Sequence, residues 1–196
     1  MTDVDPTQAG RLSFVETISV VDKQPKDLGV DRTIIFYNDS DRFHWQRPKQ
    51  LCDGRTGVIC SPNNFAYGEG EGLAEGYIRI TAQANFDRWM ELDDEQYGLE
   101  KLRWYDRIQA SAVRFVPDFR THVVDTDMFT PRTIRKFTWH DNGAVYGAPR
   151  KRLDGATHLN NLHLCGTDQG FVGIVGAMIS GITIANRCLP GIRRDR

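Results

Sequence analysis

The feature that most limits how this chain can fold is an apolar segment near its C-terminal end. Residues 171–185 form fifteen consecutive positions without a charged side chain, and three of them are glycines, Gly173, Gly176 and Gly181. A helix needs about 20 apolar residues to cross a bilayer, so this segment predicts a helix packed on protein. Each glycine inside a helix costs up to about 1 kcal/mol relative to alanine, so three together require a reason, either the close approach of a flat ligand or tight helix packing.

The residues before this segment predict a strand, a glycine-bearing turn and a helix in succession. Residues 161–166 alternate apolar and polar side chains, as a short strand does, and the turn 167–173 follows. The helix is expected over about 174–188, because a proline and a glycine come shortly after it. Such a unit directs a helix N-terminus and several backbone amides at one spot, which suits a phosphate or the electron-rich edge of a ring.

The first three quarters of the chain predict a sheet with helices. Strands are expected at 12–21, 32–37, 57–61, 76–84 and 122–127, where β-branched and aromatic residues gather. A long helix is expected over 94–115, with Asp93 or Asp94 as N-cap. Its buried face is predicted from spacings of three and four at Leu102, Tyr105, Ile108, Ala112 and Phe115. Thr130 and Pro131 predict the start of a further compact helix.

Charge and cysteine content narrow the class of protein. The formal net charge is −1, which excludes a polybasic protein held to nucleic acid by counterion release. The four cysteines have no regular spacing and are expected to be reduced core residues. The first ten residues are polar and acidic, unlike a signal or transit peptide, so a cytoplasmic protein is expected. The basic residues at 150–152 are compatible with peripheral contact with a membrane surface.

Other kinds of site are disfavoured by spacing. His158, His163 and Cys165 are the closest group of potential metal ligands, but no paired CxxC accompanies them, and no metal is expected. No GxSxG elbow surrounds a serine, which disfavours a hydrolase. The glycines of residues 68–76 alternate with glutamates, whose carboxylates would repel a phosphate.

Three segments in order resemble one family of flavoproteins. Residues 161–186, NLHLCGTDQGFVGIVGAMISGITIAN, resemble the C-terminal FAD-contacting segment of the phytoene desaturase, carotenoid isomerase and retinol saturase group. Residues 130–138, TPRTIRKFT, and 142–149, NGAVYGAP, are similar to a helix and a glycine-aromatic-glycine turn that precede that segment in the same group. The resemblance extends over roughly residues 57–189.

The resemblance implies an α+β fold in two parts. Residues 1–150 would form a substrate domain with a mixed sheet and helices, and residues 151–196 the C-terminal strand, loop and helix of a Rossmann-like FAD domain. In such oxidoreductases the flavin exchanges a hydride with a carbon–carbon bond of an isoprenoid or other apolar polyene. No catalytic acid or base is implied, because the chemistry belongs mainly to the cofactor.

The same resemblance implies which residues contact FAD. Gly166, Thr167 and Asp168 would lie near the ribityl chain and the pyrophosphate. The remaining residues would stand at the flavin ring, at the N-terminus of the last helix or beside the substrate tunnel: Phe171, Val172, Gly173, Ile174, Tyr146 and Gly147.

One part of the family pattern is absent. Such flavoproteins begin with a strand, a GxGxxG turn and a helix that hold the pyrophosphate, and this sequence contains no GxGxxG. The chain is therefore expected to be the C-terminal part, either a fragment or a subunit completed by a complementary chain with an N-terminal Rossmann unit. It is expected to bind FAD poorly alone and to associate through 171–185, in a hetero-oligomer or homo-oligomer.

Two other functions remain open from the sequence. The chain could be a non-catalytic binding or scaffolding protein that keeps the fold without flavin. It could also be a small α+β lipid-binding module, which would contain a closed apolar cavity.

Overall fold

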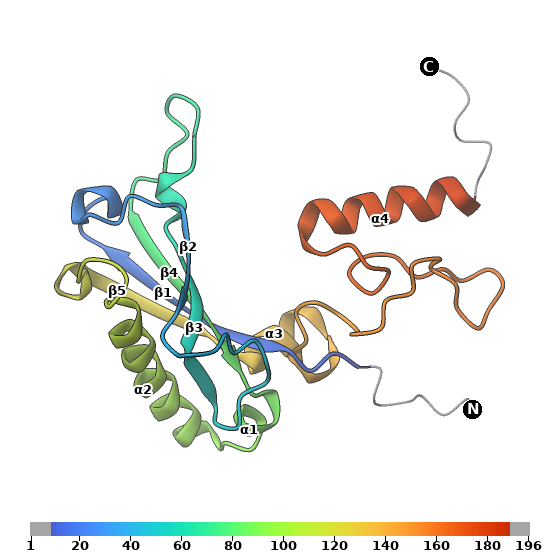
Figure 1. Cartoon of the computed structure of the whole chain (residues 1–196), viewed down its shortest axis with the longest axis horizontal. Helices are drawn as coiled ribbons and strands as arrows, with labels where there is room; N and C mark the ends of the chain where they lie inside the picture. Colours follow the sequence, from blue (N-terminus) through green and yellow to red (C-terminus); the bar gives the residue numbers. More distant parts are fainter. Residues whose placement is uncertain (1–8, 189–196) are drawn as a thin grey trace. The chain divides into compact units, whose positions relative to one another are not determined.

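The computed structural model describes residues 9–188, which form two compact units of an α+β protein. One unit holds residues 12–143, and the other holds residues 144–188 with the short segment 9–11 (Figure 1). Within residues 9–188, no helix has the length and apolar character needed to cross a membrane.

The larger unit is built on a five-stranded sheet with the order β2-β3-β4-β1-β5. The strands are β1 (Ser13–Val21), β2 (Ile34–Asn38), β3 (Cys52–Cys60), β4 (Gly76–Ala84) and β5 (Val123–Phe129). Each predicted strand of this unit is present, and β4 has the predicted bounds. The sheet is entirely antiparallel, so the expected mixed sheet is wrong. β4 and β5 run in the same direction, but β1 lies between them and keeps them from pairing.

Three helices belong to this unit: α1 (Phe86–Met90), α2 (Asp94–Ala112) and α3 (Pro131–Thr138). Asp93 caps α2, since its carboxylate accepts from the Gln96 amide at 2.8 Å, as the sequence predicts. Pro131 occupies the first position of α3, and the Thr130 amide donates to Thr133 Oγ1 at 3.3 Å. Both predicted helix starts are therefore confirmed.

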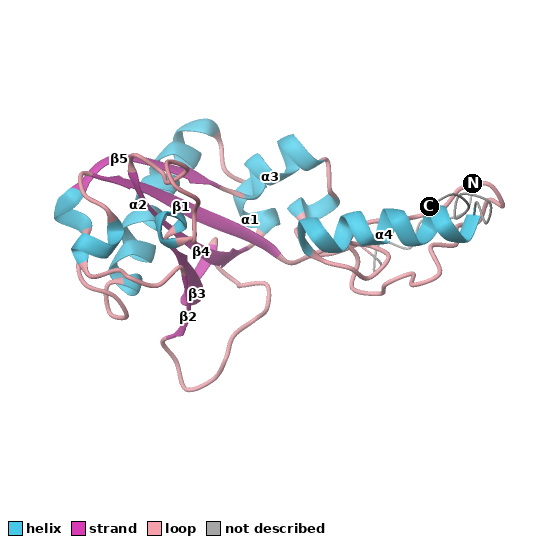
Figure 2. Cartoon of the chain, turned by 90° about the horizontal axis from the view of Figure 1, so that it is seen from above, coloured by secondary structure: helices cyan, strands magenta, loops and turns pink. Residues whose placement is uncertain are grey.

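Helix α2 packs on the sheet through a face that matches the predicted one in part, since Ile108 and Ala112 are buried as predicted. The helix ends at Ala112 and not at 115, and Phe115 is exposed. The buried residues of α2 are Trp104, Ile108, Gln109 and Ala112, and Figure 2 shows the helix beside the strands. Leu102, expected in this face, is 66% exposed. A step of two residues turns a helix by about 200°, so contact centred on Trp104 turns Leu102 to solvent.

The core lies between α2 and the sheet. Alternate residues of β4, from Ile78 to Ala84, are buried there with Ile108 of α2. On the opposite face of β4, Arg79 forms an ion pair with Glu16 of β1. Burial also raises the pKa of the Cys52 thiol.

The cysteines depart in part from the prediction. All four are free thiols, and Cys52 is the buried one. Cys60 is half-buried, whereas Cys165 and Cys188 are exposed. The two exposed cysteines lie in the smaller unit, where little of the chain is covered, so their expected place in a core is wrong.

Candidate functional site

The flavin-site residues suggested by the sequence all lie in the smaller unit, between Tyr146 and Ile174. The strand expected at 161–166 does not form, and the segment folds back on its own turn. A single β-bridge joins Ala156 to His163, and the Leu164 amide donates to the Gly155 carbonyl at 2.8 Å. A β-strand is stable only when it pairs with a neighbouring strand. Within the described residues, this segment pairs only through the bridge to Ala156 and the hydrogen bond to Gly155.

The predicted helix is present as α4 (Gly173–Cys188). Only Ser180 and Ile184 of this helix are buried. Its one charged side chain is Arg187, in the last turn, where a cation is favourable to the helix dipole. The Arg187 guanidinium donates to the Asp154 carbonyl at 2.9 Å and so ties the helix end to the preceding loop.

Two of the predicted segments meet, although about twenty residues separate them. The Ala148 amide, next to Gly147, donates a hydrogen bond to the Asp168 carboxylate. The Arg152 amide donates to the Asp168 backbone carbonyl at 3.0 Å. Asp168 therefore joins the two segments through its side chain and through its backbone. The Lys151 ammonium donates to the Tyr146 carbonyl and closes the turn around Gly147.

Position 147, where the two segments meet, requires glycine. Its φ is +68°, in the left-handed region, and a Cβ atom there would collide with the Asp168 carboxylate and lie 3.0 Å from Thr167 Oγ1. The glycine-aromatic-glycine turn therefore permits backbone to approach the 167–168 segment.

Residues 166–173 form a bend that leads into α4. Its inner side is filled by the polar side chains of Ser180 and Gln169, which the sequence did not indicate as site residues. The Gly166 amide donates to Ser180 Oγ at 2.6 Å, and Ser180 Oγ donates to Gln169 Oε1. Gln169 Nε2 donates to the Leu153 carbonyl at 3.0 Å. Both side chains are almost fully buried. The available signal was Ser180 itself, a polar residue inside an apolar helix, which must find a partner if buried.

Five backbone amides at this bend are donors without an acceptor. The amides of Thr167, Asp168, Gly170, Phe171 and Val172 have no hydrogen-bond acceptor within residues 9–188. They precede the N-terminus of α4, whose dipole adds positive potential. The bend therefore has donors for an anionic or electron-rich group.

The glycines of α4 differ in what surrounds them. A Cβ at Gly173 would meet no atom within 4 Å, and the neighbouring Ile174 is 84% exposed. At Gly176 the backbone carbonyl carbon and the Cβ of Phe171 lie 3.0 and 3.1 Å from the same position. Gly173 thus leaves open backbone at the start of the helix, whereas Gly176 allows the backbone of the bend to approach the helix closely.

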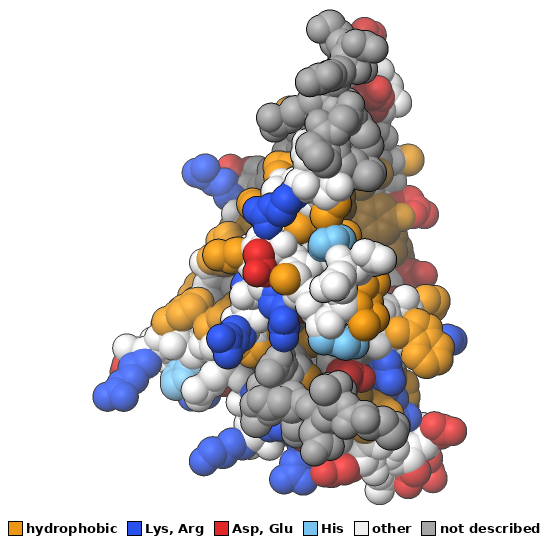
Figure 3. All heavy atoms as spheres, turned by 90° about the vertical axis from the view of Figure 1, so that its right-hand side faces the viewer, with side chains coloured by type: hydrophobic (Ala, Val, Ile, Leu, Met, Phe, Trp, Pro, Cys, Tyr) orange, Lys and Arg blue, Asp and Glu red, His pale blue; other side chains and the backbone are white. Residues whose placement is uncertain are grey.

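Around this bend lies an exposed apolar surface. Figure 3 shows hydrophobic side chains at the surface between basic ones. On α4 and the bend, the exposed large apolar residues are Phe171, Val172, Ile174, Val175, Met178, Ile179 and Ile182. Contiguous exposed apolar surface of this kind is typical of an interaction site.

No known protein-family model matches this chain, and no curated protein is similar to it at a significant level.

Proposed function

We propose that this chain is the C-terminal part of an FAD-dependent oxidoreductase that acts on an isoprenoid or other apolar polyene. Residues 144–188 complete its flavin site, and a complementary polypeptide supplies the GxGxxG unit that holds the pyrophosphate. The resemblance in the sequence suggests this function, and the geometry of the smaller unit supports it.

The observation that carries the proposal is the junction of the Gly147 turn with the Asp168 bend. The resemblance assigns both segments to one cofactor, and the Ala148 amide bonds directly to the Asp168 carboxylate. Independent loops twenty residues apart have no need to meet in this way. A shared ligand beside them would explain why both are glycine-rich and closely packed.

The backbone amides of the bend that lack an acceptor suit a flavin. The unused amides of Phe171 and Val172 would face the electron-rich edge of the ring, and the N-terminus of α4 would stabilise negative charge on it. Gly173 would let the ring approach the backbone. Bound FAD would supply the hydride exchange, and the residues of this chain would orient it and exclude water.

One oxygen of the Asp168 carboxylate has a supporting role, because Oδ1 accepts from the Ala148 amide and lies against Gly147. The second oxygen keeps its acceptor capacity for a ribityl hydroxyl. Asp168 then fixes the two segments of the site, while Thr167 remains available to a ligand through its amide.

The apolar surface of α4 supports the need for a second polypeptide. Exposed Val175, Met178 and Ile182 would be covered when the complementary Rossmann unit docks. Burying apolar area contributes about 25 cal/mol per Å², so this face can supply much of the association energy.

The test is flavin retention after co-expression with a polypeptide that carries the GxGxxG unit, which the proposal expects to be encoded by a neighbouring reading frame. The proposal expects a purified complex with the visible absorbance of oxidised flavin, and loss of that absorbance in Gly173→Val. Gly70→Val is the matched control, because Gly70 shares the left-handed backbone of Gly173, with φ of +77° against +78°, and also has no atom within 4 Å of a Cβ, but lies in the larger unit. A colourless complex, or equal loss in both variants, would contradict the proposal.

A second function, non-catalytic scaffolding, is favoured by one observation. The inner side of the bend is satisfied by Ser180 and Gln169, so this unit can keep its shape without a cofactor. A stable complex with the partner that never acquires flavin would support this alternative.

A further inference from the structure

A pocket in the larger unit lies between α2 and the segment that leads from the β2–β3 loop into β3. Its volume is about 830 Å³, within the usual range for a small-molecule site. Trp104 of α2 and Cys52 of β3 give it an apolar floor, and both are buried. It belongs wholly to residues 12–143, so it is separate from the bend at 166–173.

The pocket is lined by cations in excess of anions. Arg47, Lys49, Arg55 and Arg107 contribute to it beside the imidazole of His44, and Asp53 is its one carboxylate. Asp53 is neutralised locally, because Arg55 donates two hydrogen bonds to it, at 2.9 and 2.6 Å. The same hydrogen bonds lower the pKa of Asp53 and keep it ionised.

Two cations of the pocket remain without a carboxylate partner among residues 9–188, Lys49 and Arg107. The Arg107 guanidinium lies over the Trp104 ring, 5.0 Å from its centroid, which orients it without neutralising it. Lys49 belongs to the facing segment, so a basic residue lines the pocket from each side.

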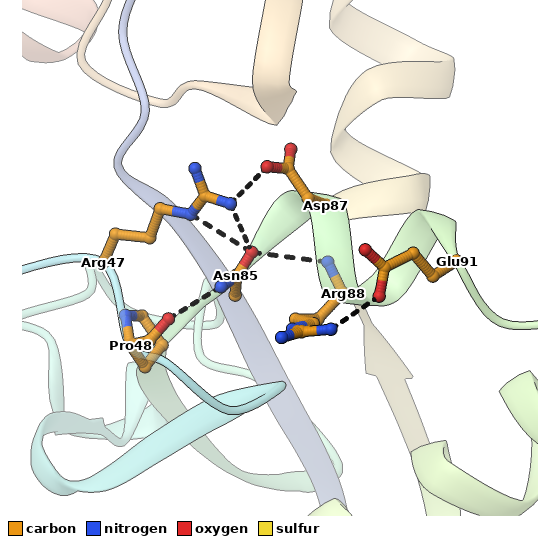
Figure 4. Close-up of polar contacts among 6 residues, drawn as sticks. All are labelled: Arg47, Pro48, Asn85, Asp87, Arg88 and Glu91. Carbon is orange, nitrogen blue, oxygen red and sulfur yellow. Dashed lines mark hydrogen bonds and ion pairs between the residues drawn. The ribbon is translucent and has the colours of Figure 1, made fainter.

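The segment that carries Lys49 is held in place by its neighbours, as Figure 4 shows. Arg47 donates two hydrogen bonds to Asn85 Oδ1, at 3.1 and 2.9 Å, and pairs with Asp87. Asn85 in turn donates to the Pro48 carbonyl at 2.7 Å. Further along the wall, Trp89 Nε1 donates to the Leu51 carbonyl at 3.0 Å. The wall is thus anchored before any ligand arrives, which reduces the ordering cost of binding.

We infer that this pocket binds a small ligand through a phosphate or diphosphate group. A dianion can use Lys49 and Arg107 together, and a planar guanidinium pairs with phosphate through two parallel hydrogen bonds. The apolar floor formed by Trp104 would hold the body of the ligand. A nucleic-acid chain does not fit, because a protein with a net charge of −1 lacks the excess of cations that tracks a phosphate backbone.

The test is calorimetric titration of the full chain with inorganic pyrophosphate and with inorganic phosphate at constant ionic strength. The pocket predicts saturable binding, tighter for pyrophosphate, that weakens about tenfold or more in Lys49→Gln and in Arg107→Gln. Lys26→Gln is the matched control, an exposed lysine of the Pro25–Leu28 turn that does not line the pocket. Circular dichroism of each variant establishes that the fold is retained.

Absence of saturable binding, or equal weakening in Lys26→Gln and Lys49→Gln, would overturn the inference. A second arm distinguishes the sources of the phosphate. The phosphate belongs to a lipid headgroup if three results agree. The chain binds vesicles of phosphatidic acid, the Lys49→Gln variant does not bind them, and pyrophosphate displaces the bound chain from them. If pyrophosphate binds while these vesicles do not, the ligand is a soluble phosphate ester.

Discussion

The Gly147 backbone lies directly against the Asp168 carboxylate, in a space that no side chain could share. This contact joins the two segments of the smaller unit that the sequence analysis assigned to one cofactor. Much of the local architecture therefore depends on the absence of a Cβ atom at residue 147.

Gly147→Ala is expected to destabilise the smaller unit by more than the cost of a left-handed alanine. The backbone conformation alone costs about 1–2 kcal/mol, and overpacking against Asp168 adds about 1–3 kcal/mol. Gly166→Ala is the matched control, since its φ is +91° but no atom lies within 4 Å of its Cβ position. Thermal unfolding of both variants measures the difference, and equal losses would argue against the contact.

Ser180→Ala is expected to destabilise the chain by about 1–3 kcal/mol. The substitution leaves the Gly166 amide and Gln169 Oε1 without their buried partner. Thr183→Ala, on the same helix, removes only a hydroxyl bonded to the Ile179 carbonyl and should change stability by less than about 0.5 kcal/mol. Denaturant unfolding compares the two, and a neutral Ser180→Ala would show that the bend does not depend on this hydroxyl.

Gln83→Leu is expected to raise stability by about 1 kcal/mol or more. Gln83 is fully buried in β4, and neither polar atom of its side chain has a hydrogen-bond partner in the described residues. Replacing such a group with an apolar one of similar size removes a desolvation cost. Gln109→Leu should do the reverse, because Gln109 Nε2 donates to Ser19 Oγ at 2.8 Å. Destabilisation by Gln83→Leu would indicate a partner that this account lacks.

The register of α2 on the sheet is tested by two alanine substitutions. Ile108→Ala should cost about 2–5 kcal/mol, because the side chain is fully buried. Leu102→Ala should change stability by less than about 0.5 kcal/mol, because the side chain faces solvent. Ile108 is common to the predicted and observed faces, so a larger loss from Leu102→Ala than from Ile108→Ala in chemical denaturation would show that Leu102 is buried after all.

Local sequence signals predicted most elements of the larger unit because they act within a few residues. The N-cap at Asp93 and the Thr130–Pro131 helix start depend on adjacent positions, and both are found. Which stripe of α2 is buried depends on where the sheet touches it, and spacing alone could not choose between Leu102 and Trp104. The strand expected at 161–166 failed for a similar reason, since a strand needs a neighbour that local pattern does not report.

The sequence likewise predicted some residues of the candidate sites and not others. Glycine spacing and the resemblance pointed to Gly147 and Gly166–Asp168, which the fold brings together. The interior partners Ser180 and Gln169 could not be foreseen, because their hydrogen bonds join positions eleven residues apart. The cationic pocket was also missed, since Lys49 and Arg107 are far apart in sequence and each resembles an ordinary surface charge.

The most direct test of the central claim is hydrogen exchange at the amides of Phe171 and Val172, in complex with the GxGxxG-bearing partner. If the bend contacts a flavin, adding FAD should slow exchange at these amides, while the Gly166 amide, already bonded to Ser180, changes little. Unchanged exchange at Phe171 and Val172, in a complex that demonstrably contains FAD, would contradict the proposed flavin contact.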